Sequence, residues 1–304
     1  MKLVTFDAGR VGRLEGDGEG DVVVELDCGS TREWFERSGQ VGETGERVGV
    51  ADVRLRAPIV PKKFFHTAGN FADHHQELQA VDWSHPVHKG IVFFQNVDAI
   101  IGPDDAIVYP EGLTKELDYE LELAIIIGKA GKFFGPDEAG DYIAGYTIAN
   151  DFGLHDFRDT DAGSMLRVKG SDTMAPLGPG LVTGWDFHGQ RLRTYVNGRL
   201  AQDGSTDEMK WDMHYLVADI ARTITLNPGD VLLSGTPAGS RPVGPGDVVD
   251  VEVDGLGRLT SHVVAGPGPI PAEFGAQPTE SEEVVSTAFG GDWEFRGIRP
   301  PIRG

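Results

Sequence analysis

The sequence predicts an α+β protein that is mostly β, and three observations carry that prediction. Short runs of β-branched and aliphatic residues recur along the chain between Gly, Pro, Asp and Asn turns, as in Lys2–Phe6 and Asp21–Leu26. Asn197-Gly198 follows such a run and is a strong signal for a two-residue hairpin. One long amphipathic stretch, Trp211–Thr223, has the apolar stripe of a helix packed on a core.

The first 60 residues predict a small N-terminal β-rich subdomain. Beyond the two strands named above, Thr31–Arg37 has the composition of one short helix, with Ser30 or Thr31 as its cap. The boundary is expected near Ala57–Pro61, where prolines interrupt the chain. No residue pattern in this part suggests a chemical role.

The remaining strands are predicted from apolar composition and alternation. Phe71–Gln79 has helical composition, and Arg167–Gly180, polar and then rich in Pro and Gly, is predicted as a loop. The expected strands are Ile91–Gln95, Ala99–Ile101, Asp118–Gly128, Ile143–Ala149, Leu181–Thr183, Arg191–Val196, Asp230–Leu233, Gly246–Val253 and Gly257–Val264.

Composition excludes several function classes. The net charge of −21 opposes binding to nucleic acid or to anionic lipid. No apolar run reaches the ~18 residues that a membrane span needs, and the N-terminus has no signal-peptide core. Cys28 is the one cysteine, so no internal disulfide is possible, and we expect a cytoplasmic protein. The scarcity of lysine beside abundant Asp and Glu leads to the hypothesis of a halophilic source.

The strand Asp118–Gly128 begins with acids at alternate positions. Side chains two apart point to the same face of a strand, so Glu120 and Glu122 are expected side by side, with Asp118 sharing their parity. Paired carboxylates need a compensating cation, for which Mg²⁺ is the natural candidate. The alternative is an acidic edge strand in an acidic protein. Asp151, at the end of the next strand, is a candidate third ligand or else part of an Asx turn or helix cap.

Other residues suit acid–base and anion chemistry. His74 and Glu77, three apart on a predicted helix, could hold a water and take its proton, although an ordinary surface contact is the simpler interpretation. Lys169 near a dication would stabilise an enolate or a carboxylate, whereas a lone lysine is usually solvated. The turn Ser234–Pro237 presents hydroxyl and N–H groups suited to a carboxylate.

Taken in order, these segments resemble the fumarylacetoacetate hydrolase family, in its 2-hydroxyhepta-2,4-diene-1,7-dioate isomerase and acylpyruvase-like branch. The resemblance covers residues 64 to about 264 and rests on a series of motifs rather than on one. These are Asn70–Glu77, Asp118–Leu123, Gly145–Asp151, Lys169–Pro179, Asn197-Gly198, Pro228–Asp230, Ser234–Gly239 and Pro245–Asp247.

The resemblance implies a mixed β-roll catalytic domain over residues 61–265 in a protein that is usually a homodimer. The small subdomain of residues 1–60 precedes it. Residues 266–304 form a C-terminal extension, either an arm on a partner subunit or a mobile tail.

The resemblance also assigns roles to residues of this chain. It implies Glu120, Glu122 and Asp151 as ligands of Mg²⁺ or Mn²⁺, His74 and Glu77 as a water-activating pair on a lid helix, and Lys169 as a lysine facing the substrate. Thr236 would contact a substrate carboxylate. Two departures, His155 for the family's usual Arg and Arg158 for its Gln, fall at expected substrate positions, and Gln95 stands where many members have Lys.

The implied function is a metal-dependent enzyme acting on a small 2-oxo acid. We expect hydrolytic C–C cleavage of an acylpyruvate-like 1,3-diketo acid. The alternative is an isomerase or decarboxylase of an unsaturated 2-oxo diacid of the 5-carboxymethyl-2-hydroxymuconate type, in aromatic catabolism. A non-catalytic binding member of the fold is the third hypothesis, and retention of Lys169 and of the candidate ligands counts against it.

Overall fold

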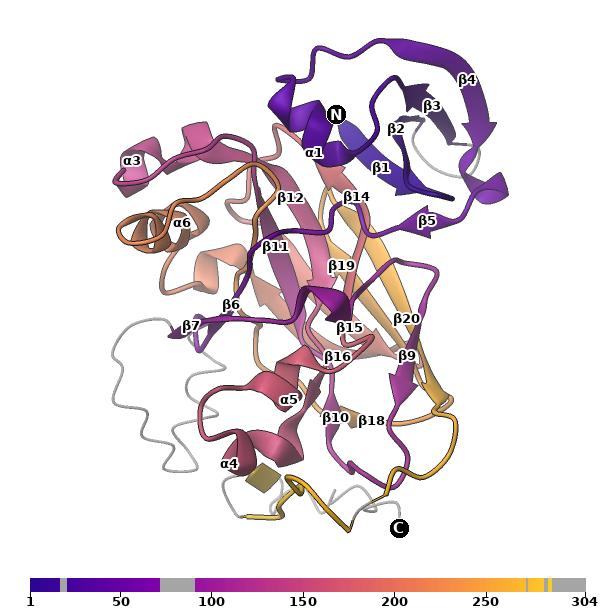
Figure 1. The fold of residues 1–304 in the computed structure, drawn as a ribbon, viewed down its shortest axis with the longest axis vertical. Coiled ribbons are helices and arrows are strands. Elements are labelled where there is room, and N and C mark those ends of the chain that lie inside the picture. Colours follow the sequence, from indigo (N-terminus) through magenta and orange to yellow (C-terminus); the bar gives the residue numbers. More distant parts are fainter. Residues whose placement is uncertain (17–20, 72–90, 272, 282–283, 286–304) are drawn as a thin grey trace.

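Strands dominate the molecule, with short helices at its margins (Figure 1). The computed structural model describes residues 1–16, 21–71, 91–271, 273–281 and 284–285. The predicted fold class, α+β and mostly β, is confirmed.

The largest sheet runs from the N-terminal strands through the centre of the molecule. Its strand order is β4-β3-β2-β1-β14-β12-β11-β17-β6-β7, with β5 on β1 and β8 on β14. The bounds are β1 Lys2–Phe6, β2 Arg10–Glu15, β3 Val22–Leu26, β4 Glu43–Gly49, β5 Leu55–Arg56, β6 Phe64–Ala68, β7 Ile91–Phe94, β8 Ile100–Ile101, β11 Leu121–Ile127, β12 Ile143–Asn150, β14 Ala175–Val182 and β17 Val231–Leu233.

Two further sheets complete the β-structure of the described residues. One has the order β16-β15-β19-β20-β9, and the other is a small sheet, β13-β10-β18. The bounds are β9 Ala106–Tyr109, β10 Leu117–Asp118, β13 Gly153–Leu154, β15 Arg191–Val196, β16 Arg199–Ser205, β18 Pro242–Val243, β19 Val248–Val253 and β20 Gly257–Ala265. Asn197 and Gly198 both have positive φ, as the predicted two-residue hairpin between β15 and β16 requires.

The described helices are short. They are α1 Thr31–Glu36, α3 Pro136–Ala139, α4 Arg158–Asp161, α5 Leu166–Gly170 and α6 Met213–Ala221, with 3₁₀ turns at η1 Val50–Asp52, η2 Val97–Ala99, η3 Gly140–Tyr142, η4 His155–Phe157 and η5 Thr206–Glu208. Ser30 caps α1 by accepting from Glu33 N, and α6 buries the apolar stripe that its sequence predicts.

Strand β11 lies between two hydrophobic clusters and is buried along its whole length. Leu121, Leu123, Ile125 and Ile127 pack into the larger cluster, whereas Ala124 and Ile126 pack into the second one. The acids Glu120 and Glu122 have the parity of Ala124 and Ile126, so they stand at the start of the strand on the face of the second cluster.

The N-terminal strands are not separated from the rest of the chain by a sheet boundary. Lys2 and Leu3 of β1 pair with Val182 and Leu181 of β14, so β1 to β5 extend the central sheet (Figure 1). The division of the chain near residue 60 stays a prediction.

Two local predictions were wrong. The expected strand Asp118–Gly128 is two strands, β10 and β11, with residues 119 and 120 between them. The expected loop Arg167–Gly180 contains α5 and most of β14, because pairing with β12 and β8 holds this Pro/Gly-rich segment extended.

The described part of the C-terminal extension contacts its own chain. Thr279 N donates to Asp156 O at 2.8 Å, Thr160 Oγ1 donates to Gln277 O, and Val284 is fully buried. These contacts hold the extension against η4 and α4. The arm on a partner subunit stays a prediction.

None of the described helices combines the length and the apolar character that crossing a membrane would require.

Candidate metal centre

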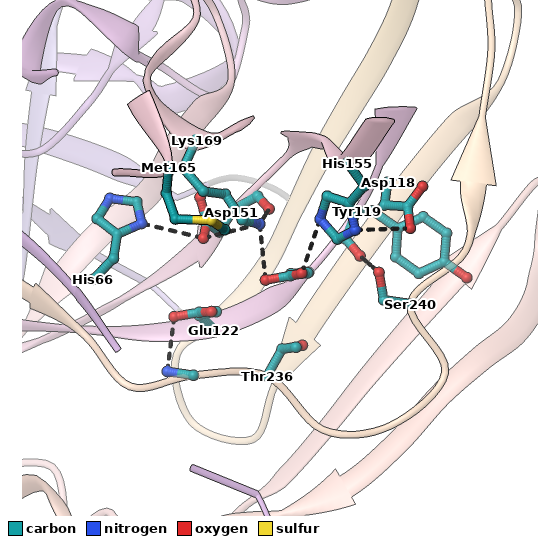
Figure 2. A network of polar contacts seen from close by, with 12 residues as sticks. His66, Asp118, Tyr119, Glu122, Asp151, His155, Met165, Lys169, Thr236 and Ser240 are labelled. Atoms are coloured by element: carbon teal, nitrogen blue, oxygen red, sulfur yellow. Dashed lines mark hydrogen bonds and ion pairs between the residues drawn. The ribbon is translucent and has the colours of Figure 1, made fainter. Parts of the chain in front are cut away.

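Three buried carboxylates converge at the start of β11. Glu120, Glu122 and Asp151 each offer an oxygen, and these three oxygens lie within 4.8 Å of one another. The exposed fractions of the three residues are 6%, 1% and 2%. Two separate segments of the chain therefore supply one acidic site, as the sequence predicts, and Figure 2 shows it beside Lys169.

Strand register explains the convergence. Leu121 of β11 is opposite Asn150 of β12, and Asp151 N donates to Glu120 O at 2.7 Å, so Glu120 and Asp151 face each other. Glu122 lies two residues further along the same face. The side chain of Asn150 accepts from Glu120 N and fixes the entry into β11.

Each carboxylate has one oxygen held by a protein donor. Lys169 Nζ lies 2.9 Å from Glu120 Oε2 and 3.1 Å from Asp151 Oδ2, and it donates to Asp151 O at 2.8 Å (Figure 2). Gly235 N donates to Glu122 Oε2 at 2.8 Å. His66 Nδ1 lies 3.1 Å from Asp151 Oδ2. Asp151 Oδ1 is the oxygen of Asp151 that no donor among the described residues holds.

The donor set fits a hard divalent cation. Asp151 Oδ1 is buried and has no hydrogen-bond partner within the described residues. Burial, followed by the charges of Asp151 and Glu120, raises the pKa of Glu122 well above its usual range. Lys169 alone cannot balance three carboxylates. Carboxylate oxygens are the ligands that Mg²⁺ and Mn²⁺ prefer, so these residues could hold such an ion.

Lys169 stays charged in this setting. Burial acts to lower the pKa of Lys169, but the carboxylates of Asp151 and Glu120 outweigh it, and the pKa lies above its usual value. The lysine comes from α5, whose first N–H groups are held by the buried carboxylate of Asp161: Val168 N donates to Asp161 Oδ2 at 3.0 Å. Asp161 thus sets the position of the helix that carries Lys169.

His155 links the site to a second buried acid. Its Nε2 lies 3.3 Å from Glu120 Oε1, and its Nδ1 lies 3.3 Å from Asp118 Oδ2 (Figure 2). Burial, together with the positive charge of Arg158, lowers the pKa of His155 to about 3, so the ring is neutral. Burial and the charges of Glu116 and Glu120 raise the pKa of Asp118 well above its usual value. Asp118 therefore does not join the trio but contacts it through His155.

Buried acids continue from Asp118 toward a cavity of about 840 Å³. Glu116 is 5% exposed and lines that cavity, and burial and the charge of Asp156 raise the pKa of Glu116 to about 7. Asp156 accepts from Thr114 Oγ1 and Lys115 N. The trio of carboxylates does not line this cavity.

The other predicted site residues are distributed as follows. His74 and Glu77 lie outside the described residues. Thr236 lies on the loop after β17, one residue from the amide that holds Glu122. Arg158 begins α4, and its charge acts on His155 and Asp118. Gln95 is buried and donates to Met165 O at 3.1 Å, so it braces the segment that leads into α5.

Two residues of the site were not predicted. His66 follows two buried phenylalanines in β6, and its ring contacts the side chain of Asp151. A histidine within an apolar strand is a weak signal for such a role. Gln202, in β16, bonds to Thr236 at 2.9 Å and has no signal in the sequence, because its partners are distant along the chain.

The fold and the acidic site define a β-rich protein with a candidate site for a divalent cation at the start of a core strand. The family model for the fumarylacetoacetate (FAA) hydrolase C-terminal domain matches residues 63–264. The chain belongs to the fumarylacetoacetate hydrolase family, whose members are enzymes.

Three relatives show the range within the family. A 5-carboxymethyl-2-hydroxymuconate delta-isomerase from Mycobacterium smegmatis is 36% identical with a TM-score of 0.77, covering 87% of this chain and 100% of its own. An oxaloacetate tautomerase from Xenopus laevis is 39% identical, covering 70% of this chain and 69% of its own. A maleylpyruvate hydrolase from Sphingobium, solved with manganese(II) and pyruvate, is 26% identical with a TM-score of 0.70, covering 88% of this chain and 100% of its own.

Proposed function

We propose that this protein is a divalent-metal-dependent enzyme that acts on a 2-oxo acid, and that it hydrolyses a C–C bond of an acylpyruvate-like 1,3-diketo acid. The observation that carries the proposal is the trio of buried carboxylates with Lys169 against it and an unpartnered oxygen on Asp151. The manganese(II) and pyruvate named for the Sphingobium hydrolase support this combination of ion and substrate class.

The three carboxylates would hold Mg²⁺ or Mn²⁺. Such an ion, when bound, supplies Lewis-acid polarisation of the substrate ketone. The chain's own residues supply the rest. Lys169, charged and buried, would stabilise negative charge that develops on the substrate, and Thr236 would hold its carboxylate.

The proposed hydrolysis adds one water to the diketo acid. His74, oriented by Glu77, would take a proton from that water, and the oxygen would attack the carbonyl carbon distant from the carboxylate. The C–C bond then breaks, and its electron pair leaves with the pyruvate half as an enolate beside Lys169. Protonation of that enolate gives pyruvate, and the other product is the carboxylic acid of the acyl group.

The second candidate is isomerisation, tautomerisation or decarboxylation of a 2-oxo diacid in aromatic catabolism. The isomerase of M. smegmatis and the tautomerase of X. laevis favour it, since both relatives are more similar to this chain than the Sphingobium hydrolase is. The same enolate would form, but proton movement would replace the attack by water. Lys169 and Thr236 keep their roles in this version.

Location, oligomeric state and source are part of the proposal. We propose that the enzyme is a cytoplasmic homodimer. Its mass in solution, measured by light scattering, tests whether it is a dimer. A halophilic source is proposed from the net charge of −21. Melting measured from low to molar KCl tests that point, and full stability at low salt would contradict it.

A substrate panel tests the function. The purified protein, with Mn²⁺ or Mg²⁺ and again with EDTA, is incubated with acetylpyruvate, oxaloacetate and a muconate-type diacid. We expect pyruvate and acetate from acetylpyruvate, only with metal. If oxaloacetate or the diacid is converted while acetylpyruvate is not cleaved, the second candidate would replace hydrolysis as the proposed reaction. Metal-dependent turnover of none of the three would overturn both. Glu122→Gln is the inactive control.

His74→Ala tests the proposed water-activating pair. If hydrolysis is the reaction, this variant binds Mn²⁺ normally and loses acetylpyruvate cleavage. A variant that still cleaves acetylpyruvate at the parent rate would remove His74 and Glu77 from the proposed mechanism.

A further inference from the structure

The side chain of Gln202 joins β11, the metal-site strand that begins between Glu120 and Glu122, to the loop that carries Thr236. Its Oε1 accepts from Thr194 Oγ1 at 2.7 Å and from Leu121 N at 3.3 Å. Its Nε2 donates to Thr236 Oγ1 at 2.9 Å and to Pro237 O at 2.7 Å. Gln202 is 1% exposed, so all four contacts lie in the interior.

Two of these partners fix the direction of the amide. Leu121 N can only donate, and Pro237 O can only accept, so the oxygen of Gln202 must face Leu121 and its nitrogen must face Pro237. Gln202 therefore donates to Thr236 Oγ1. The hydroxyl of Thr236 is an acceptor in this bond, and its own proton is left for a different partner.

That proton has no protein acceptor within the described residues. Thr236 is 3% exposed, and the one hydrogen bond of its hydroxyl found there is the one that it accepts from Gln202. A buried hydroxyl donor without an acceptor is costly, so the site favours a ligand that brings an acceptor oxygen. Thr236 is on the loop whose Gly235 amide holds Glu122, so that oxygen would lie near the trio of carboxylates (Figure 2).

We propose that Gln202 is a positioning residue that makes Thr236 an obligatory hydrogen-bond donor, so that the site selects a carboxylate over a neutral amide at this position. The inference rests on the proposed function and deepens it, because it gives a physical reason for choosing a 2-oxo acid. Gln202 acts only through Thr236 and the loop.

The packing around Gln202 keeps the loop in one place. A Cβ on Gly204 would lie 2.6 Å from Pro237 Cβ, and one on Gly239 would lie 2.5 Å from Ala201 O, so β16 and the loop are in close contact at both points. Leu121, which donates to Gln202, stands between Glu120 and Glu122. One amide thus sets the distance between the metal-site strand and the Thr236 hydroxyl.

Calorimetry with the Mn²⁺-loaded protein tests the inference, with pyruvate and its neutral amide, pyruvamide, as probes. Gln202→Met removes the donor without adding charge. We expect pyruvate to bind about tenfold more weakly and its preference over pyruvamide to shrink, while the Mn²⁺ dissociation constant stays within threefold. In turnover of a panel substrate, KM should rise tenfold and kcat should change less than twofold.

Two further variants control for a merely structural effect. Thr194→Val removes a bond to the oxygen side of the same amide, so it should lower the melting temperature and leave pyruvate affinity unchanged. In a Thr236→Val background, adding Gln202→Met should not weaken pyruvate binding any further. If Gln202→Met does not fold, Gln202→Glu, which retains the acceptor contacts to Thr194 and Leu121, is measured with the same expectation.

The outcomes separate this inference from the proposed function. Unchanged pyruvate affinity in Gln202→Met, or an equal loss in the Thr236→Val background, would overturn the role of Gln202 even if the panel shows turnover. Conversely, tight pyruvate binding that falls in Gln202→Met would support the inference even if none of the panel substrates reacts.

Discussion

Lys169 Nζ lies 2.9 Å from Glu120 Oε2, and the same ammonium group contacts the side chain and the carbonyl oxygen of Asp151. This ammonium group is a full positive charge in direct contact with two of the three carboxylates. The contact therefore holds two acidic segments together and also occupies oxygens that a metal ion would approach. Removing the lysine should therefore lower the stability of the metal-free protein and strengthen the binding of a metal ion.

Lys169→Met should destabilise the metal-free protein by roughly 3 kcal/mol, because it leaves buried carboxylates without their partner. Added Mn²⁺ should restore most of that loss, since the ion replaces the missing charge. Turnover should be lost even with metal. Denaturant unfolding with and without Mn²⁺ measures the effect, and Lys62→Met, at an exposed position, is the control. Equal destabilisation with and without the ion would contradict this account.

Glu122→Gln tests the ligand set without changing side-chain shape. Mn²⁺ affinity measured by calorimetry should fall roughly a hundredfold or more, because the amide cannot replace a carboxylate ligand. The metal-free variant should be more stable than the parent near pH 8. Because the pKa of Glu122 is raised in the folded protein, the protonated carboxyl group stabilises the fold at low pH, and this stabilisation is lost as pH rises. The neutral amide of Gln does not lose a proton, so it avoids this loss.

The exposed Glu46 provides the matched control for that change of charge. Glu46→Gln should alter neither Mn²⁺ affinity nor metal-free stability measurably. If Glu122→Gln binds Mn²⁺ as the parent does, the trio is not the ligand set.

Gly153→Ala tests how closely the residues around the trio are packed. A Cβ at this position would lie 2.8 Å from His155 Nε2 and 3.1 Å from Lys169 Nζ, so both side chains would have to move. We expect a folded protein with turnover reduced at least about tenfold, because the displaced lysine no longer faces the substrate. Gly42→Ala, where a Cβ meets nothing within 4 Å, should keep full turnover. Normal turnover in Gly153→Ala would show that Lys169 tolerates displacement.

Local sequence pattern predicted the core of the site. The two-residue spacing of Glu120 and Glu122 placed them on one face, and the end of a predicted strand made Asp151 a candidate third member, whose approach to Glu120 the register of β11 and β12 explains. These inferences needed only the alternation of a strand and the presence of a cross-strand neighbour.

Residues whose roles depend on distant segments were beyond such patterns. The helix that carries Lys169 was predicted as a loop, because the carboxylate that accepts from its first N–H groups, Asp161, lies outside the segment and the segment's own sequence is polar. His66 meets Asp151 and Gln202 meets Thr236 only after the sheets have formed. The composition of β14, rich in Pro and Gly, is unfavourable for a strand, and the segment is extended because β1 and β12 pair with it.

Glu116→Gln should change how stability depends on pH. The pKa of Glu116 is about 7 in the folded protein, against an ordinary value of 4.5, so the folded state binds this proton more tightly than the unfolded state does. The stabilisation is complete below the ordinary value and is lost as pH rises through about 7. Relative to the parent, the variant should gain stability between pH 5 and pH 8, by at most about 3 kcal/mol. Denaturant unfolding at the two pH values measures the gain, and Glu46→Gln should show none. A gain that is equal at both pH values would mean that Glu116 is ionised in the folded protein throughout this range.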